Sequence, residues 1–170
     1  MRRPLVFALV LTLSATGAWA DRYSDCSQSK DPDRQIRGCT QIIERGKRES
    51  REWRSYAYYN LGLAYQKKGE VDRAIADYTK AIAIDQKYSN AYNNRGLAYY
   101  RKSEVDRAIA DYDKAIAIDP KYAYAYNGRG AAYQKKGEVD RAIADYRKAL
   151  EIDPSYSYPK ENLKRLGVTL

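Results

Sequence analysis

A ten-residue segment recurs three times in this chain at a constant interval. It reads Gly-Glu-Val-Asp-Arg-Ala-Ile-Ala-Asp-Tyr at residues 69–78 and 137–146, and it begins with Ser103 in the copy at 103–112. Each copy starts 34 residues after the one before it. A period between about 20 and 50 residues indicates stacked repeats, in which each unit packs against its neighbours. The sequence therefore predicts a solenoid, an architecture that often serves as a binding surface.

Each unit reads as two helices joined by a short turn. In the first unit, one apolar stripe lies within residues 58–65 and a second within 74–82, both at helical spacing. Gly69 between them is a helix stop signal. Neither stripe can stabilise an isolated helix, so neighbouring units must stack. The expected fold class is all-α, with units at residues 55–88, 89–122 and 123–156.

The first twenty residues have the organisation of a secretory signal peptide. Arg2 and Arg3 form a short basic start, residues 5–13 are apolar except for Thr12, and Ala18-Trp19-Ala20 matches a small-x-small cleavage site. We expect cleavage after Ala20, which makes residues 1–20 the leader. The apolar run is short for a bilayer span, so an uncleaved anchor is the weaker alternative, and no membrane span is expected after cleavage.

Cys26 and Cys39 are the two cysteines of the chain. In an oxidising compartment such a close pair favours a structural disulfide, which the chain-entropy account values at about 3 kcal/mol. Free thiols and a redox pair are the alternatives, although a redox pair more often has only two residues between its cysteines. A metal site would need further ligands, and the chain has no histidine.

Residues 21–54 read as a degenerate copy of the helix pair. Asp31-Pro32 resembles a helix start, with Asp as N-cap and Pro at the first helical position. A shift of 39 residues aligns three positions with the first full unit: Asp33 with Asp72, Cys26 with Tyr65 and Cys39 with Tyr78. Terminal repeats are atypical because they cap the core. We expect the charged residues 46–54 to form a turn and residues 157–170 to form a capping helix.

The charges point away from nucleic acid and from catalysis. The formal charge is +9, but the excess is spread along the chain, whereas nucleic-acid binders concentrate it on one face. A basic pair such as Lys67-Lys68 at one turn of each unit is interpreted as solvated turn charge. The commonest general base is missing because there is no histidine. We expect no nucleic-acid partner, no enzymatic activity, no cofactor and no metal.

Asp77, Asp111 and Asp145 recur at the same place in the three units. We expect them on the helix face opposite the apolar stripe. Each has an Arg four residues before it and a Lys three residues after it, so local ion pairs on one helix explain them. Arg95 and Arg129, in turn, are expected to lay their stems along apolar surface while their charged heads reach water.

The chain resembles the tetratricopeptide repeat family, whose units have a period of 34 and the pattern W-x2-L-G-x2-Y, A-x3-F, P. The first unit reads Tyr58-x2-Leu61-Gly62-x2-Tyr65 and then Ala74-x3-Tyr78; the later units keep this spacing with Arg in place of Leu. The resemblance implies a right-handed superhelical solenoid of helix-turn-helix units. Together with the leader and the early cysteine pair, the chain is similar to small secreted proteins of this family in Gram-negative bacteria, which implies a periplasmic location.

In this family the first helix of each unit lines a concave groove, and the resemblance carries that role to matching positions here. These are Tyr56, Tyr59, Asn60, Leu63, Lys67, Asn90, Asn93, Asn94, Leu97, Arg101, Tyr124, Asn127 and Lys135. Tyr offers a large flat contact with a polar tip, and Asn can both donate to and accept from a peptide backbone. Lys67, Arg101 and Lys135 would add a basic edge for an acidic peptide. The simpler interpretation is that Tyr and Asn only support helix packing and solubility.

The resemblance implies a non-enzymatic interaction module, an adaptor that holds an extended peptide or a partner helix in the groove. A self-associating structural unit and an envelope-associated scaffold are the alternatives, so a homo-oligomer is left open. The family's clamp for chaperone tails uses Lys, Asn and Arg at five places. Those places here hold Tyr59, Leu63, Asn94, Tyr124 and Gly128. Since only Asn94 matches, chaperone tails are not the expected ligand.

Overall fold

The computed structural model describes residues 15–169, with side chains described from Asp21 onward. That part of the chain holds nine α-helices, one short 3-10 helix and no strand, so the all-α expectation is confirmed. The elements are α1 (Ala15–Gln28), α2 (Pro32–Glu44), η1 (Gly46–Arg48), α3 (Arg51–Lys67), α4 (Val71–Ile84), α5 (Ser89–Arg101), α6 (Val105–Ile118), α7 (Ala123–Lys135), α8 (Val139–Ile152) and α9 (Ser157–Arg165). Residues 1–14 of the expected leader lie outside the described residues, and α1 runs through its expected cleavage point.

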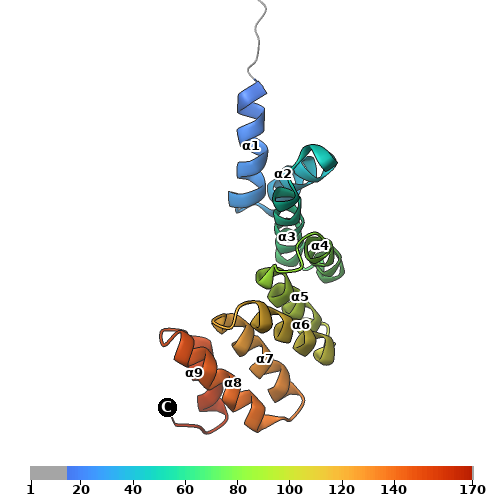
Figure 1. The fold of residues 1–170 in the computed structure, drawn as a ribbon. Helices are drawn as coiled ribbons and strands as arrows, with labels where there is room; N and C mark the ends of the chain where they lie inside the picture. The colour runs from blue at the N-terminus through green and yellow to red at the C-terminus, as the bar shows by residue number, and fades with distance from the viewer. Residues whose placement is uncertain (1–14, 170) are drawn as a thin grey trace, which may run out of the picture.

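The helices form successive antiparallel pairs that stack into a curved array (Figure 1). The pairs are α1 with α2, α3 with α4, α5 with α6, and α7 with α8, and α9 packs on the last of them. Contacts also join α1 to α3, α5 to α7 and α7 to α9. The odd-numbered helices therefore lie side by side and carry the surface on which the groove is expected. None of the described helices is both long and apolar enough to cross a bilayer.

The turn inside each unit requires one residue in the left-handed region. Gly69 and Gly137 occupy it with φ of +77° and +80°. Ser103 holds the same place in the second unit at φ +63°, which costs about 1 kcal/mol for a residue with a side chain. The packing of the α5–α6 pair tolerates this cost, so the substitution does not interrupt the array.

The core of each unit is a tyrosine pressed against a glycine. Tyr78, Tyr112 and Tyr146 are the largest side chains in the fully buried core. A Cβ atom added at Gly62 would lie 2.6 Å from the Tyr78 ring, and one at Gly130 would lie 2.8 Å from the Tyr146 ring. Tyr therefore fills the position at which the family pattern has Phe, because the facing glycine leaves room for its ring.

Tyr112 packs differently from its two counterparts. Tyr78 and Tyr146 each donate a hydrogen bond to a glutamine Oε1, of Gln66 at 3.0 Å and of Gln134 at 2.8 Å. Tyr100 holds that glutamine's place in the second unit, and the Tyr112 ring lies against Gly128 of the next unit, where a Cβ atom would be 2.6 Å away. Gly128 is thus a contact position between units.

Asp111 and Asp145 are buried, which corrects the expectation that they lie on the solvent face. Each is 6% exposed. Arg95 donates to Asp111 through Nε and Nη2, both at 2.8 Å, and Arg129 donates to Asp145 at 2.8 and 2.7 Å. The guanidinium heads of these arginines therefore bind protein acceptors instead of reaching water, because a carboxylate on the facing helix offers them two oxygens. The third nitrogen reaches the preceding unit, at Thr79 Oγ1 (3.0 Å) and Asp113 Oδ1 (2.6 Å).

Asp77 is the exception because Leu61 stands where the other units have arginine. It is 5% exposed, and its partner is Lys80 on the same helix, with Nζ 3.0 Å from Oδ1. Burial raises the pKa of the Asp77 carboxyl above its ordinary value. Ionisation of this carboxyl is therefore less favourable in the folded state than in the unfolded chain.

Replacing Asp77 with Asn is expected to raise the melting temperature at neutral pH. A carboxyl whose pKa is higher in the folded than in the unfolded state adds stability when protonated and loses it as pH rises through the folded pKa. The gain of Asp77→Asn should therefore shrink as pH falls through the raised pKa of the folded state, and it should be lost below about 4, the ordinary pKa of Asp. Thermal unfolding at several pH values checks this, and a gain that is equal at neutral and acid pH would contradict it.

Exposed ion pairs connect each unit to the one before it. The second lysine of each turn reaches back to an aspartate in the first turn of the preceding unit's second helix. The pairs are Lys68–Asp33 at 2.6 Å, Lys102–Asp72 at 2.6 Å and Lys136–Asp106 at 2.8 Å. Asp33 therefore makes the same contact as Asp72, as its alignment at a shift of 39 residues indicates.

The amino-terminal hairpin is closed by a disulfide between Cys26 and Cys39, whose sulfur atoms are 2.12 Å apart. Asp31 caps α2 by accepting from the Asp33 N–H at 2.9 Å, and Pro32 opens the helix. The charged turn is shorter than expected. Ser50 caps α3 by accepting from the Trp53 N–H at 3.1 Å, so α3 begins at Arg51 and the residues before Ser55 are helical.

Candidate functional site

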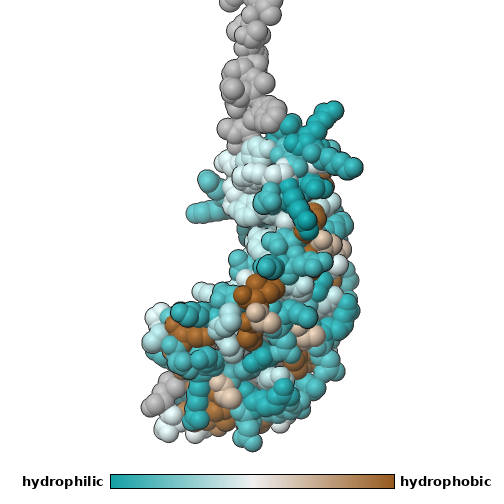
Figure 2. All heavy atoms as spheres, in the orientation of Figure 1, coloured by the Kyte–Doolittle hydropathy of each residue, from teal (hydrophilic) through white to brown (hydrophobic). Residues whose placement is uncertain are grey.

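The predicted groove residues lie on α3, α5 and α7, the adjoining first helices of the three units. Lys67, Asn90, Arg101, Tyr124 and Lys135 are exposed. A second group is partly buried and comprises Tyr56, Tyr59, Leu63, Asn93, Asn94, Leu97 and Asn127. The face in view in Figure 2 is mainly hydrophilic, with separate hydrophobic patches along the stack.

Asn60 does not line the groove, which corrects its predicted role. It is 4% exposed. Its Nδ2 donates to the Tyr56 carbonyl at 2.9 Å, and its Oδ1 accepts from Gln35 Nε2 at 3.4 Å. Both ends of this amide are thus engaged inside the protein, and a bound peptide could not reach them.

Gln35 is a structural residue that the sequence did not reveal. It comes from α2 and is 3% exposed. Besides Asn60, it donates to the Cys26 carbonyl at 3.2 Å and accepts from Lys67 Nζ at 3.2 Å. The shift of 39 residues places Gln35 on Ala74, so the repeat pattern carries no signal for it. Lys67 is thereby tethered to the amino-terminal hairpin.

Two further asparagines hold tyrosine hydroxyls, one across the boundary between the first two units and one at the end of the third unit. Asn94 Nδ2 donates to Tyr59 Oη at 2.9 Å. Asn127 Nδ2 donates to Tyr156 Oη at 3.3 Å, and its Oδ1 accepts from Asn162 Nδ2 at 3.4 Å. For these positions the interpretation that Tyr and Asn support helix packing holds in part, because the asparagine amides position tyrosine rings. Asn90, in contrast, is exposed, so its side-chain amide is accessible to a ligand.

Tyrosines gather at the amino-terminal ends of the first helices. Tyr59 packs on Tyr88 with ring centroids 4.9 Å apart, and Tyr124 packs on Tyr156 at 4.8 Å. Tyr124 is 56% exposed, while burial raises the pKa of Tyr156 to about 12. Tyr88 and Tyr156 were not among the predicted groove residues. The signal for them was present, because Tyr ends all three units.

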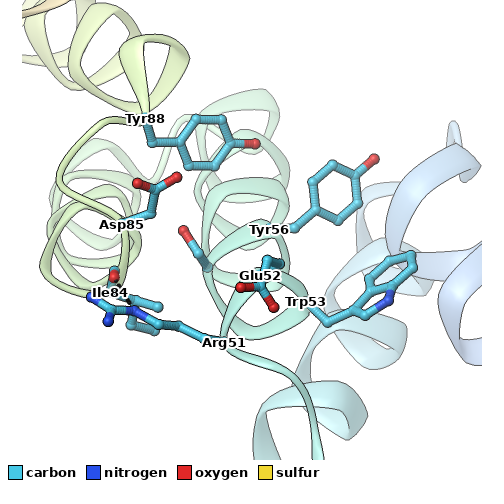
Figure 3. A pocket seen from close by; sticks show the side chains of 8 residues that line it. Arg51, Glu52, Trp53, Tyr56, Ile84, Asp85 and Tyr88 are labelled. Atoms are coloured by element: carbon cyan, nitrogen blue, oxygen red, sulfur yellow. Dashed lines mark hydrogen bonds between the residues drawn. The ribbon is translucent and has the colours of Figure 1, made fainter. Parts of the chain in front are cut away.

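A cavity of about 630 Å³ opens at the amino-terminal end of α3, beside the turn from α4 to α5 (Figure 3). We call it the aromatic pocket. It is lined by Arg51, Glu52, Trp53, Ser55, Tyr56, Ile84, Asp85 and Tyr88. Tyr56 is its one predicted groove residue. Arg51, Glu52 and Trp53 escaped prediction because residues 51–54 were expected to form a turn.

The basic edge lies at the opposite ends of the same helices. Lys135 donates to Ser103 Oγ at 2.9 Å and lies 5.0 Å from the centroid of the Tyr100 ring. Lys67 is likewise bound to Gln35 of the amino-terminal hairpin. Neighbouring units therefore hold two of the three cations of the basic edge. Arg101 is exposed and presents the third cation.

Comparison with known families and structures identifies the architecture. Tetratricopeptide repeat models match residues 55–88 and 123–156, and two further repeat models of this kind match 98–137 and 77–110. The TPR domain of Arabidopsis OM64 is 31% identical, and the match covers 69% of this chain and 97% of that domain with a TM-score of 0.68. The chain belongs to the tetratricopeptide repeat (TPR) family. TPR domains are protein–protein interaction modules.

Other solved TPR structures resemble it to a similar degree. MamA is 34% identical, with 72% of this chain and 69% of that chain covered at a TM-score of 0.64. The first TPR domain of Spaghetti (RPAP3), solved with the HSP90 peptide SRMEEVD, is 29% identical, with 68% of this chain and 92% of that chain covered at a TM-score of 0.67. Comparison with curated proteins gives no match.

Proposed function

We propose that this TPR protein is a non-enzymatic adaptor that holds an extended peptide or a partner helix across α3, α5 and α7. The observation that carries the proposal is the exposed contact set on these adjoining helices. Tyr124 is 56% exposed on α7, and Asn90 and Arg101 are exposed at the two ends of the neighbouring α5. Flat aromatic area combined with an amide that donates and accepts suits recognition of a peptide backbone.

Solved relatives support a peptide ligand of this kind. RPAP3 TPR domains have been solved with the HSP90 peptide SRMEEVD and the HSP70 peptide SGPTIEEVD. The clamp places for such tails hold Tyr59, Leu63 and Gly128 here where cations or asparagines would be needed. The space beside Gly128 is also occupied by the Tyr112 ring, so a larger side chain would not fit there. We therefore expect this chain to bind a different peptide and to leave SRMEEVD unbound.

Substituting exposed groove residues is expected to reduce peptide capture without unfolding the protein. The full chain would be immobilised and panned against displayed random peptides, and the retained peptides would be titrated against Tyr124→Ala and Asn90→Ala. Loss of a contact residue such as Tyr124 should weaken binding about five- to thirty-fold. Asn60 is unsuitable for this test because it is buried.

The matched control is Val139→Ala, since Val139 is 41% exposed on α8, outside the predicted groove. It should leave peptide affinity unchanged. All three variants should melt within a few degrees of the parent chain. Equal affinity of the parent and the groove variants for every retained peptide would refute the groove assignment.

We further propose that the adaptor works in the bacterial periplasm. The support is the leader-like pattern that ends at Ala18-Trp19-Ala20 and the disulfide of the hairpin, since disulfides persist in oxidising compartments. Expression in a Gram-negative host, osmotic shock and amino-terminal sequencing test it. A mature chain that starts at Asp21 in the shock fluid supports the proposal, and a chain that keeps residues 1–20 in the cytoplasm refutes it.

A further inference from the structure

We propose that the aromatic pocket binds the lysine or arginine side chain of a peptide that lies in the groove. The inference rests on the proposed function and adds the chemistry of the ligand to it. Its basis is the combination of aromatic walls, a carboxylate on either side and a cavity of about 630 Å³ that is large enough for a long side chain.

The walls suit an apolar stem with a cationic tip. Trp53 and Tyr56 lie edge to face with ring centroids 5.6 Å apart, and Tyr88 faces them across the cavity (Figure 3). Trp53 is 40% exposed, so part of the indole is open to a ligand. Lysine and arginine lay their methylene stems on such surface, and their charged ends are attracted to the electron-rich faces of Trp and Tyr.

The charges of the pocket favour a cation. Glu52 and Asp85 both line it, and hydrogen bonds from the Glu52 backbone N–H and the Ser50 hydroxyl hold the pKa of the Glu52 carboxyl below its usual range. Asp85 keeps one oxygen on the Lys87 N–H at 2.9 Å. Arg51 also lines the pocket, where its Nε donates to the Ile84 carbonyl at 2.6 Å, at the negative end of the α4 dipole. The two carboxylates therefore outnumber the one guanidinium.

The later units provide an internal comparison. The places of Trp53 hold Lys87 and Lys121, and the place of Glu52 holds Gln86 in the second unit. These substitutions put a cation where the first unit has an aromatic ring and remove one carboxylate. The difference arises because α3 has 17 residues and α5 and α7 have 13, so the extra turn of α3 brings Glu52 and Trp53 to the pocket.

The pocket opens beside the groove, so a peptide could fill both. Tyr56 belongs to the pocket and to the predicted groove, and Tyr88 of the pocket packs on groove residue Tyr59 at 4.9 Å. Lys67 of the basic edge lies at the far end of α3, about 21 Å along the helix from Trp53 at 1.5 Å per residue. A cationic side chain of the peptide would therefore bind at the aromatic pocket and not at the basic edge. This contact would fix the direction in which the peptide crosses the helices.

The test is a titration that follows tryptophan fluorescence in the full chain with Trp19→Phe, which leaves Trp53 as the one tryptophan. The probes are the N-acetyl methylamides of lysine, arginine, norleucine and glutamate. Lysine and arginine should bind more tightly than norleucine by about two- to five-fold, which is the range for exposed ion pairs and cation–π contacts. Glu52→Gln and Asp85→Asn keep the hydrogen-bonding oxygens and should each remove most of this preference.

Asp119→Asn is the matched control, because Asp119 accepts from the Lys121 N–H at 3.0 Å as Asp85 accepts from Lys87. It should leave the preference intact. If the norleucine amide bound as tightly as the lysine amide, the inference would be overturned. A preference for lysine and arginine that survived both pocket substitutions would overturn it too.

Random-peptide panning separates the two proposals. Retained peptides that are enriched in lysine or arginine and lose affinity on Glu52→Gln support the pocket. Retained peptides with no such enrichment and no response to Glu52→Gln overturn the pocket and leave the groove standing. If no peptide is retained while the lysine amide still binds, the pocket takes a free cation, and the assignment to a peptide side chain falls together with the groove.

Discussion

Replacing Asp111 with Ala is expected to lower the free energy of unfolding by about 3 kcal/mol. The change removes both acceptors of Arg95 Nε and Nη2 and leaves a charge whose side chain is 16% exposed with only Thr79 Oγ1 at 3.0 Å. Removing one partner of a buried pair costs far more than the pair contributes, because the remaining charge cannot return to water. Denaturant unfolding followed by circular dichroism measures the loss.

The control is Asp77→Ala in the first unit. Asp77 has no facing arginine, and its partner Lys80 has a side chain that is 56% exposed, so the lysine returns to water when the carboxylate is removed. The loss there should stay below about 1 kcal/mol. Similar losses for Asp77→Ala and Asp111→Ala would show that the arginine link is not what makes Asp111 matter.

Removing the disulfide is expected to have the second largest effect. Cys26→Ala with Cys39→Ala should destabilise the amino-terminal hairpin by about 3 kcal/mol, because the unfolded segment regains the freedom that the closed loop denied it. Both cysteines are fully buried, so alanine keeps the packing apolar. In a repeat stack each unit depends mainly on its neighbours, so the loss should remain local to α1 and α2.

Hydrogen exchange measured along the chain tests both the size and the place of this effect. Amides of α1 and α2 should lose protection, and the contact of Tyr23 with Trp53, at 4.6 Å between ring centroids, should loosen. Amides of α7 and α8 serve as the internal reference and should be unchanged. The parent chain treated with reductant should behave like the double variant. Uniform loss of protection along all units would contradict a local role.

The fold followed from the sequence because its determinants are periodic. The 34-residue interval, the glycine at the turn and the Asp31-Pro32 helix start each act locally, and each describes the structure correctly. Arg95 and Asp111 could not be paired in the same way. They are 16 residues apart on two facing helices. The spacing along one helix indicates only Arg107 and Lys114 as partners of Asp111.

The candidate site was less predictable because its features break the repeat. Gln35 binds Asn60 and Lys67 from a hairpin that aligns only weakly with the other units. The aromatic pocket exists because the Ser50 cap starts α3 at Arg51, one turn before the repeat begins. A pattern shared by all units can locate the groove, but it cannot reveal contacts that occur in only one unit.

Two kinds of ion pair hold the array together, and salt distinguishes them. Lys102–Asp72 and Lys136–Asp106 are exposed and join successive units, whereas Arg95–Asp111 is buried within one unit. Mobile ions screen exposed pairs much more than buried ones. Each unit should therefore keep its internal geometry at high ionic strength while the joints between units soften, so that the pitch of the superhelix, and with it the spacing of contacts offered to a bound peptide, responds to the salt concentration around the protein.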